Sequence, residues 1–209
     1  MAIILPPLHS KNLKLKPGER RFGTCLLRNL EDDYHCWVDV PVGPKQRRPD
    51  FIVLHPGRGI LVLEVKSWKL PTILSMNRFT AEIHTDRGPK TEINPLEQAR
   101  SCAIEIKEVL ERDPLLVQQE PGRYHGHLLL PWGFGVVLTE ITRKQFEATG
   151  LEQAIPADKV ICQDEMTRFI WTLMCATTCR CQGDTLVTVT VFCRLTHASA
   201  PKRRSGRGR

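Results

Sequence analysis

The sequence predicts an α/β fold with one domain over residues 17 to about 166. Apolar residues recur at helical spacing in two segments, near residues 19–30 and 96–110. Short β-rich runs lie between these segments and another follows the second one, so the order is helix, strands, helix, strand, helix, which suits a single α/β domain. The chain has 209 residues, 41% apolar and 25% charged, which is the composition of an ordinary globular protein.

The first helix is predicted to begin at Pro17 and to carry an acid on its buried side. Apolar residues recur on one face, namely Phe22, Leu26 and Leu30, and Glu19 lies three residues before the first of them on the same face. An acid on the buried side of a first helix is unusual. A strand pattern over residues 34–42 follows, and then a basic loop over residues 43–49.

The central feature is a predicted hairpin, formed by apolar runs at 51–55 and 60–66 around a Pro-Gly-Arg-Gly turn. Near-continuous apolarity indicates burial on both faces. A three-residue loop, Gly57-Arg58-Gly59, would place Asp50 opposite Lys66 and on the same face as Glu64. A four-residue loop would turn Asp50 to the other face, so this cluster depends on the turn.

Two carboxylates and an ammonium group on an apolar hairpin are costly to bury unless they pair or bind a cation. Oxygen ligands suit Mg²⁺, which is commonly held by one or two carboxylates and which activates water and polarises phosphoryl groups. Lys66 could then orient or deprotonate the attacking water, or stabilise charge on the phosphate. The alternative is a structural ion pair between Glu64 and Lys66.

The second half of the domain is predicted to begin with short strands over residues 72–93, with a turn at 86–88. Asn94 then caps a helix that starts at Pro95 and runs to about residue 112. Its expected core-facing residues are Ala99, Ala103, Ile106 and Leu110. A strand at 134–138, a short helix at 142–148 and a last strand at 159–162 complete the prediction.

The motif Pro49-Asp50, followed by Glu64-Val65-Lys66, resembles the PD-(D/E)xK nuclease signature. The wider context resembles the nuclease-related domain family, NERD, through Gly18-Glu19 and through three longer segments: Pro49 to Leu54, Gly59 to Trp68, and Asn94 to Ala99. The resemblance covers roughly residues 17–166. It implies a restriction-endonuclease-like core, which is a central mixed β-sheet flanked by helices, and in particular the branch that precedes UvrD-type DNA helicases.

The resemblance also implies the roles of individual residues. Asp50, Glu64 and Glu19 would be ligands of Mg²⁺ or Mn²⁺, Lys66 would be the motif lysine, and Gln98 would lie near the site. The basic loop, with Lys45, Arg47 and Arg48, is the expected contact for a substrate backbone at the rim of the site.

These roles predict a metal-dependent nuclease that hydrolyses phosphodiester bonds in DNA, in DNA processing or repair. The alternative is a non-catalytic nucleic-acid-binding or docking module that is accessory to a DNA helicase. The chain lacks a G-x-x-x-x-G-K-[ST] phosphate loop, so it is not itself a motor.

The two ends of the chain differ from the domain. Residues 1–16 are expected to be an extended segment. The net charge of +7 comes entirely from residues 167–209, which hold eight basic residues and one acid. We interpret this Cys- and Thr-rich tail as a solvated, disordered end or as a truncated or out-of-frame product, and its Cys175, Cys179 and Cys181 as incidental thiols. The neutral remainder weakens the case for strong DNA binding by the domain alone.

No apolar run approaches the roughly 20 residues that span a bilayer. The start of the chain lacks the basic region of a secretory signal. We therefore expect a cytoplasmic protein without membrane association and with its thiols reduced.

Overall fold

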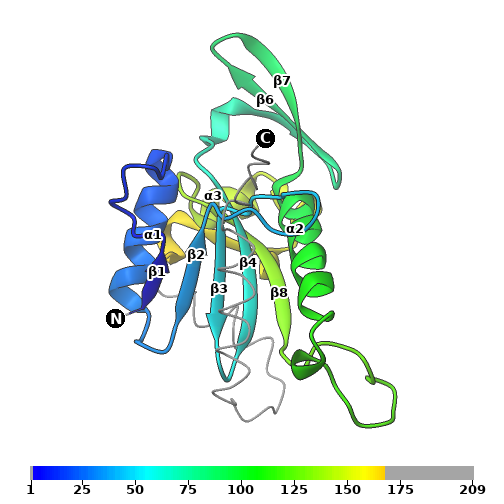
Figure 1. The fold of residues 1–209 in the computed structure, drawn as a ribbon. Helices are drawn as coiled ribbons and strands as arrows, with labels where there is room; N and C mark the ends of the chain where they lie inside the picture. The colour runs from blue at the N-terminus through cyan, green and yellow to red at the C-terminus, as the bar shows by residue number, and fades with distance from the viewer. Residues whose placement is uncertain (1, 168–209) are drawn as a thin grey trace, which may run out of the picture.

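The computed structural model of the protein describes residues 2–167 and has two sheets (Figure 1). The central sheet has six strands in the order β1-β2-β3-β4-β8-β9 and is mixed, since β2, β3 and β4 pair antiparallel whereas the other neighbours are parallel. A second sheet holds β5, β6 and β7. The predicted α/β fold with a mixed central sheet and flanking helices is thereby confirmed.

The strands of the central sheet are β1 (Ile3–Leu5), β2 (His35–Val38), β3 (Phe51–His55), β4 (Gly59–Lys66), β8 (Trp132–Leu138) and β9 (Val160–Cys162). Those of the second sheet are β5 (Ile73–Met76), β6 (Thr80–Thr85) and β7 (Gly88–Ile93). The helices are α1 (Pro17–Asn29), α2 (Pro95–Leu110) and α3 (Arg143–Ala148).

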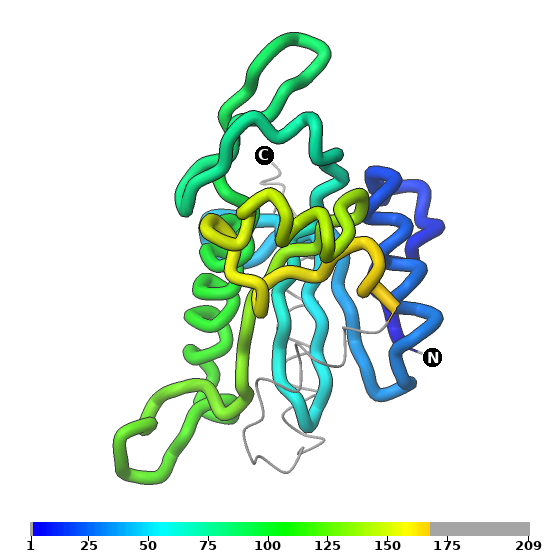
Figure 2. Tube along the Cα trace, turned by 180° about the vertical axis from the view of Figure 1, so that it is seen from behind, coloured from blue at the N-terminus to red at the C-terminus, as the bar shows by residue number. Residues whose placement is uncertain are grey.

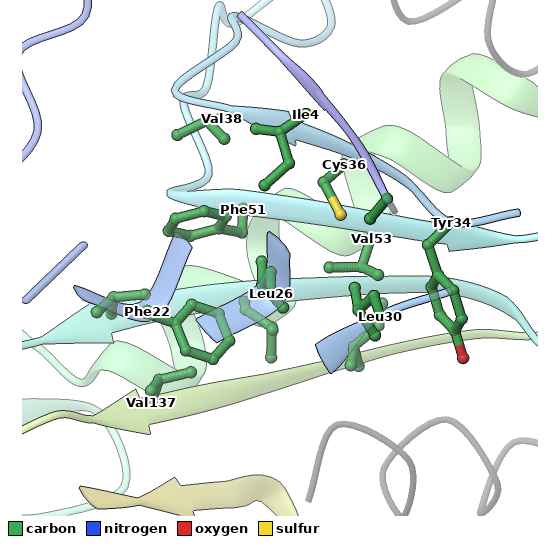
Figure 3. Packing of buried hydrophobic residues seen from close by; sticks show 14 of the residues in the cluster. Ile4, Phe22, Leu26, Leu30, Tyr34, Cys36, Val38, Phe51, Val53 and Val137 are labelled. Carbon is green, nitrogen blue, oxygen red and sulfur yellow. The ribbon is translucent and has the colours of Figure 1, made fainter. Parts of the chain in front are cut away.

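Helices α1 and α2 cover opposite faces of the central sheet, and β3 and β4 are buried between them as predicted. Phe51 and Val53 pack with Phe22 and Leu26 of α1 (Figure 3). The alternate residues of β3 and β4 pack with the core-facing side of α2, and include Ile52, Leu54, Ile60 and Val62. Because side chains alternate along a strand, the remaining even-numbered residues of β4 also lie on the α2 side.

The N-terminal segment forms the first edge of the central sheet. β1 pairs in parallel with β2, and the side chains of Ala2, Ile4, Leu8 and Leu13 join the core beneath α1. β2 is shorter than the predicted 34–42 strand, because Asp39 adopts a left-handed backbone with φ of 50° and ends the strand.

The register of the β3–β4 hairpin differs by two residues from the predicted one. The loop is residues 56–58, His55 lies opposite Gly59, and Phe51 lies opposite Leu63 rather than Val65. The turn closes directly after His55, whose carbonyl accepts a hydrogen bond from Arg58 N–H. Gly59 has φ of 94° and belongs to the strand, where an added Cβ would lie 2.0 Å from the carbonyl oxygen of Pro131. Glycine is therefore needed at position 59 because β4 packs closely against the chain before β8, and not because residue 59 lies in the middle of the loop.

The second sheet projects beyond the end of the central sheet at which β4 ends, and its tip is the β6–β7 turn (Figures 1 and 2). The fully buried Asn94 joins it to the domain. The Asn94 side chain donates to the carbonyls of Asn77 and Ala154 and accepts from Leu96 N–H at the start of α2. This one residue thus fixes the entry to α2, the second sheet and the chain after α3.

Over residues 2–167, no helix is long and apolar enough to cross a membrane. The cysteines in this range, Cys25, Cys36, Cys102 and Cys162, are free thiols. The interpretation of the basic tail and its cysteines concerns positions that lie outside the described residues, apart from Thr167.

Candidate active site

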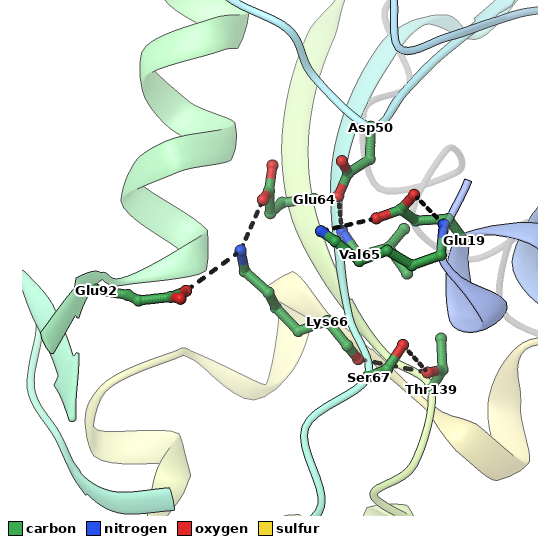
Figure 4. Close-up of polar contacts among 9 residues, drawn as sticks. Glu19, Asp50, Glu64, Val65, Lys66, Ser67, Glu92 and Thr139 are labelled. Atoms are coloured by element: carbon green, nitrogen blue, oxygen red, sulfur yellow. Dashed lines mark hydrogen bonds and ion pairs between the residues drawn. The ribbon is translucent and has the colours of Figure 1, made fainter. Parts of the chain in front are cut away.

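The candidate site lies where β4 ends and β3 begins (Figure 4). Glu64 and Lys66 are two residues apart on β4 and share the side that faces α2. Asp50 directly precedes β3, and its Oδ2 accepts a hydrogen bond of 2.7 Å from the backbone N–H of Val65. Continuing the observed register places Asp50 beside Glu64 instead of Lys66. A shift of two residues leaves the face unchanged, so the three side chains still gather.

Lys66 is largely buried and is surrounded by groups that attract its charge. Its Nζ lies 2.9 Å from Glu64 Oε1 and 3.9 Å from Glu92 Oε2 in β7. The ring of Trp68 lies 5.5 Å from the same nitrogen, within the range of a cation–π contact. The side chain of Lys66 is only 11% exposed. An ammonium group at this depth needs such partners to offset its lost hydration.

Glu19 approaches from α1, because Gly18 lets the first turn of the helix come close to the chain after β4 and β8. A Cβ at residue 18 would lie 2.0 Å from Ser67 Oγ and 2.6 Å from Thr139 Oγ1. Glu19 is buried, with 6% exposure, and Lys16 binds both of its carboxylate oxygens. Lys16 Nζ lies 3.1 Å from Oε1, and Lys16 N–H donates to Oε2 over 2.9 Å. Glu19, the inward-facing acid of α1, therefore lies near the candidate site and is already paired with Lys16.

Burial and mutual repulsion shift the protonation of the acids. Burial, and next the charge of Glu64, raises the pKa of Asp50 from 3.8 to about 7, against the opposing hydrogen bond from Val65. Burial also raises the pKa of Glu64, with Lys66 opposing the shift. Burial would lower the pKa of Lys16, but its hydrogen bond and ion pair with Glu19 raise it above the ordinary value. The charges of Asp50 and Glu64 also act on Lys16, so the acids and this lysine form one electrostatic group.

Asp50 and Glu64 have the chemistry that a hard divalent cation requires. Within residues 2–167, no hydrogen bond engages Asp50 Oδ1 or Glu64 Oε2, so each carboxylate keeps one oxygen for a ligand. Mg²⁺ usually takes one or two carboxylates and completes its shell with water and phosphate oxygens. Glu19 differs, because each of its oxygens already contacts Lys16, so a metal at Glu19 would compete with that ion pair. The two hairpin acids therefore fit a cation as they stand, and the helix acid fits one less well.

A family model described as nuclease-related domain matches residues 14–130, which is more than half of the chain. The chain belongs to the NERD family. The matched range contains the acids, Lys66 and the second sheet, whereas β8 and β9 lie beyond it. No curated protein and no solved structure matches the chain.

Gln98 of this NERD domain lies on the side of α2 that faces β4. Its Oε1 is buried and has no hydrogen-bond partner in the described part of the chain. Cys102, one turn further on the same face, has a pKa raised to about 11, first by burial and then by the charge of Glu64. This face of α2 therefore faces Glu64, which is consistent with a position of Gln98 close to Glu64 and Asp50.

The basic loop of the NERD domain is packed against acids rather than presented freely. Arg47 Nε lies 3.0 Å from Oε2 of the buried Glu105 in α2, and Lys45 N–H donates to Oε1 of the same residue. Arg48 pairs with Asp39 at 3.1 Å. Of the three predicted substrate contacts, Lys45 alone has an exposed side chain with no ion pair among residues 2–167. The charge that this loop offers to a phosphate backbone is thus reduced.

A second group of possible metal ligands lies at the opposite end of the hairpin. Glu31, Asp33 and His55 place one ligand atom each within 4.8 Å of the others, and no other described set of three acids, histidines or cysteines does so. However, His55 Nδ1 accepts a hydrogen bond from Gly57 N–H, so its proton lies on Nε2, which donates to Asp33 Oδ2 over 2.8 Å. Because neither ring nitrogen keeps a free lone pair, this group fits a structural hydrogen bond from a neutral imidazole to a carboxylate better than a metal site.

Sequence reasoning missed two residues of the candidate site, Glu92 and Lys16. Glu92 lies in the segment that was predicted only as short strands, and it reaches Lys66 through the folding of the second sheet. Lys16 lies in the N-terminal segment and pairs with Glu19 three residues later. The spacing of Lys16 and Glu19 is a signal that the sequence does contain, whereas the approach of Glu92 has no local signature.

Proposed function

We propose that this NERD domain is a metal-dependent nuclease that hydrolyses phosphodiester bonds in DNA, in DNA processing or repair. The observation that carries the proposal is the pair of Asp50 and Glu64, each with one carboxylate oxygen free of internal hydrogen bonds, beside the buried Lys66. Membership of a nuclease-related family supports the same chemistry.

In this proposal Asp50 and Glu64 hold Mg²⁺ or Mn²⁺, and Glu19 joins them if Lys16 moves away. A bound ion of this kind polarises a phosphoryl group and lowers the pKa of a coordinated water. The N–H of Val65 orients the Asp50 carboxylate so that Oδ1 stays available. Lys66 orients the attacking water and stabilises the negative charge that develops on the phosphate. Gln98, with its unpaired buried oxygen, would help to orient that water.

The proposed partners follow from the same chemistry. The substrate would be nucleic acid, most simply DNA, with Lys45 and, more weakly, Arg47 and Arg48 near its backbone. A UvrD-type helicase would be the partner in the cell, and the cytoplasm would be the compartment. Because acids already pair with Arg47 and Arg48, the domain alone should have only modest affinity for DNA. A helicase partner would then supply much of the affinity for DNA.

A second candidate function is a non-catalytic nucleic-acid-binding or docking module. It is favoured by one observation: Lys66 is already paired with Glu64 and Lys16 with Glu19, so two of the three acids are neutralised by the protein itself. Such pairs are also found in purely structural networks.

Cleavage of labelled single- and double-stranded DNA with Mg²⁺ or Mn²⁺ separates the two functions. Wild type is compared with Glu64→Gln and Lys66→Ala, each checked for folding by circular dichroism. Metal-dependent cutting that both folded variants lose would establish the nuclease. Equal signals from wild type and variants would reject it and leave the docking module.

A further inference from the structure

The second sheet brings a fourth acid to Lys66. Glu92 lies opposite Ala81 in the β6–β7 pair, and the side chain of Ala81 is fully buried. Directly opposite residues of an antiparallel pair share a face, so Glu92 lies on the inner side of this sheet. Figure 4 shows its carboxylate pointing at Lys66 from the side opposite to Glu64.

Glu92 itself is fixed in place by Lys90. Its Oε1 lies 2.8 Å from Lys90 Nζ, which leaves Oε2 directed to Lys66 at 3.9 Å. The side chain is 24% exposed, so the contact lies at the edge of the buried group rather than in its centre. The ammonium group of Lys66 therefore stands between two carboxylates, hydrogen-bonded to Glu64 and about 1 Å too far from Glu92 for a hydrogen bond.

Metal binding at Glu64 would disturb its ion pair with Lys66. A cation on Oε2 would offset the negative charge of the carboxylate and repel the ammonium group, so Lys66 would lose much of the attraction of its closest acceptor. Leaving a largely buried charge without its partner is strongly unfavourable and would oppose metal binding. A second acceptor within reach of the same nitrogen would remove most of that opposition.

We propose that Glu92 is a positioning residue that accepts the Lys66 ammonium when Glu64 binds the metal ion. The inference rests on the proposed nuclease function. By a small movement Lys66 exchanges Glu64 for Glu92 and stays charged and ordered beside the reacting phosphate. The second sheet is then a working part of the active site, because it supplies the acceptor that lets Glu64 change partners.

Titration calorimetry with Mn²⁺ alone tests this role without relying on activity. The variants are Glu92→Gln, Lys66→Met and the double variant, and the control is Glu82→Gln on the opposite face of the same sheet, where Glu82 contacts Ser75. We expect Glu92→Gln to weaken Mn²⁺ binding five- to tenfold, but less than twofold when Lys66→Met is already present. Glu82→Gln should match wild type.

A shorter acid separates positioning from simple charge. Glu92→Asp keeps the charge but withdraws the carboxylate from a lysine that is already 3.9 Å away. It should therefore weaken Mn²⁺ binding nearly as much as Glu92→Gln, and in a cleavage assay both should lower kcat about tenfold with KM within twofold of wild type.

Two results would overturn the role of Glu92 alone: an unchanged Mn²⁺ affinity in Glu92→Gln, or an equal loss with and without Lys66. In either case Mn²⁺ binding and cleavage by wild type would leave the nuclease proposal standing. Failure of wild type to bind Mn²⁺ at all would overturn both.

Discussion

Acidic and basic side chains lie together at both ends of the β3–β4 hairpin, but their hydrogen bonding differs between the two ends. At the strand end, Asp50, Glu64 and Lys66 lie between the two helices and the second sheet. At the turn end, Glu31 and Asp33 meet His55 beside the loop. The turn end is the more compact set of ligand atoms, yet its histidine is engaged at both nitrogens, whereas the strand end keeps two carboxylate oxygens free. Free lone pairs on the ligand atoms, rather than closeness alone, distinguish a candidate metal site from a structural hydrogen-bonded group.

Burial favours the neutral form of Asp50 at the strand end and of His55 at the turn end, so protein stability should depend on pH in opposite directions at the two ends. It raises the pKa of the Asp50 carboxyl to about 7 and lowers the pKa of the His55 imidazole below its usual value. Asp50 therefore keeps its proton to a higher pH than an exposed aspartate, and His55 loses its proton at a lower pH than an exposed histidine.

The largest expected difference is in catalysis. Lys66→Met should lower the rate of metal-dependent DNA cleavage by about 10²–10⁴-fold, because it removes the group that orients water and stabilises the developing charge. His55→Gln, at the turn end, should stay within twofold of wild type. Rates measured with labelled duplex and single strands at saturating Mg²⁺ check this. Comparable losses at both ends would contradict the assignment of the site.

Stability should depend more on Asn94, near the strand end, than on the turn end. Asn94→Ala removes three hydrogen bonds, including the cap of α2, and leaves the carbonyl of the buried Ala154 without its Asn94 donor. We expect a loss of about 2–4 kcal/mol in the free energy of unfolding. His55→Gln should cost only about 1 kcal/mol. Urea unfolding curves measure both, and equal losses would show that Asn94 does not tie the second sheet to the domain.

In a chelator, Asp50→Asn should stabilise the protein above neutral pH. Because the pKa of Asp50 is raised to about 7 in the folded state, its protonated form favours folding, and this contribution declines as pH rises from about 4 to about 7. At pH 8 the neutral asparagine should add about 2 kcal/mol, since it avoids the burial of a charge. The gain should vanish near pH 4. A variant that is less stable than wild type at pH 8 would contradict the shift.

The His55 end should show the opposite slope. A lowered histidine pKa gives stability that is present above the ordinary pKa of 6.5 and is lost as pH falls below it. When the free energy of unfolding is plotted against pH, the slope for His55→Gln should therefore differ from that of wild type only below about pH 6.5.

The smallest expected effect is on metal affinity. Protons compete with the cation at Asp50, whose pKa is about 7, so the Kd for Mn²⁺ should rise about fivefold between pH 7 and pH 6. Calorimetry at the two pH values measures the change, and Asp50→Asn should bind Mn²⁺ weakly at both. A Kd that does not depend on pH in wild type would place the ion elsewhere.

Much of the strand end could be predicted because it depends on local periodicity. Glu64 and Lys66 share a face through simple alternation, and Glu19 shares one with Phe22 through helical spacing. Even the error in the hairpin register did no harm to the cluster, because a shift of two residues keeps Asp50 on the same face. The N-cap at Asn94 was equally local.

Long-range packing decides what sequence could not predict. Glu92 meets Lys66 only because the second sheet folds back over the end of β4. Arg47 pairs with Glu105, 58 positions away, and this contact reduces the charge that Arg47 offers to a substrate. Residue spacing within a single helix or strand cannot predict either contact.

NMR can show directly which end of the hairpin binds the ion. Substoichiometric Mn²⁺ broadens the NMR signals of nearby backbone amides in the isotope-labelled protein. We expect the signal of the Val65 amide, which donates to Asp50, to disappear first, and that of the Gly57 amide, which donates to His55, to persist. Loss of the Gly57 signal with Val65 intact would place the metal at the turn end and rule out Asp50 and Glu64 as its ligands.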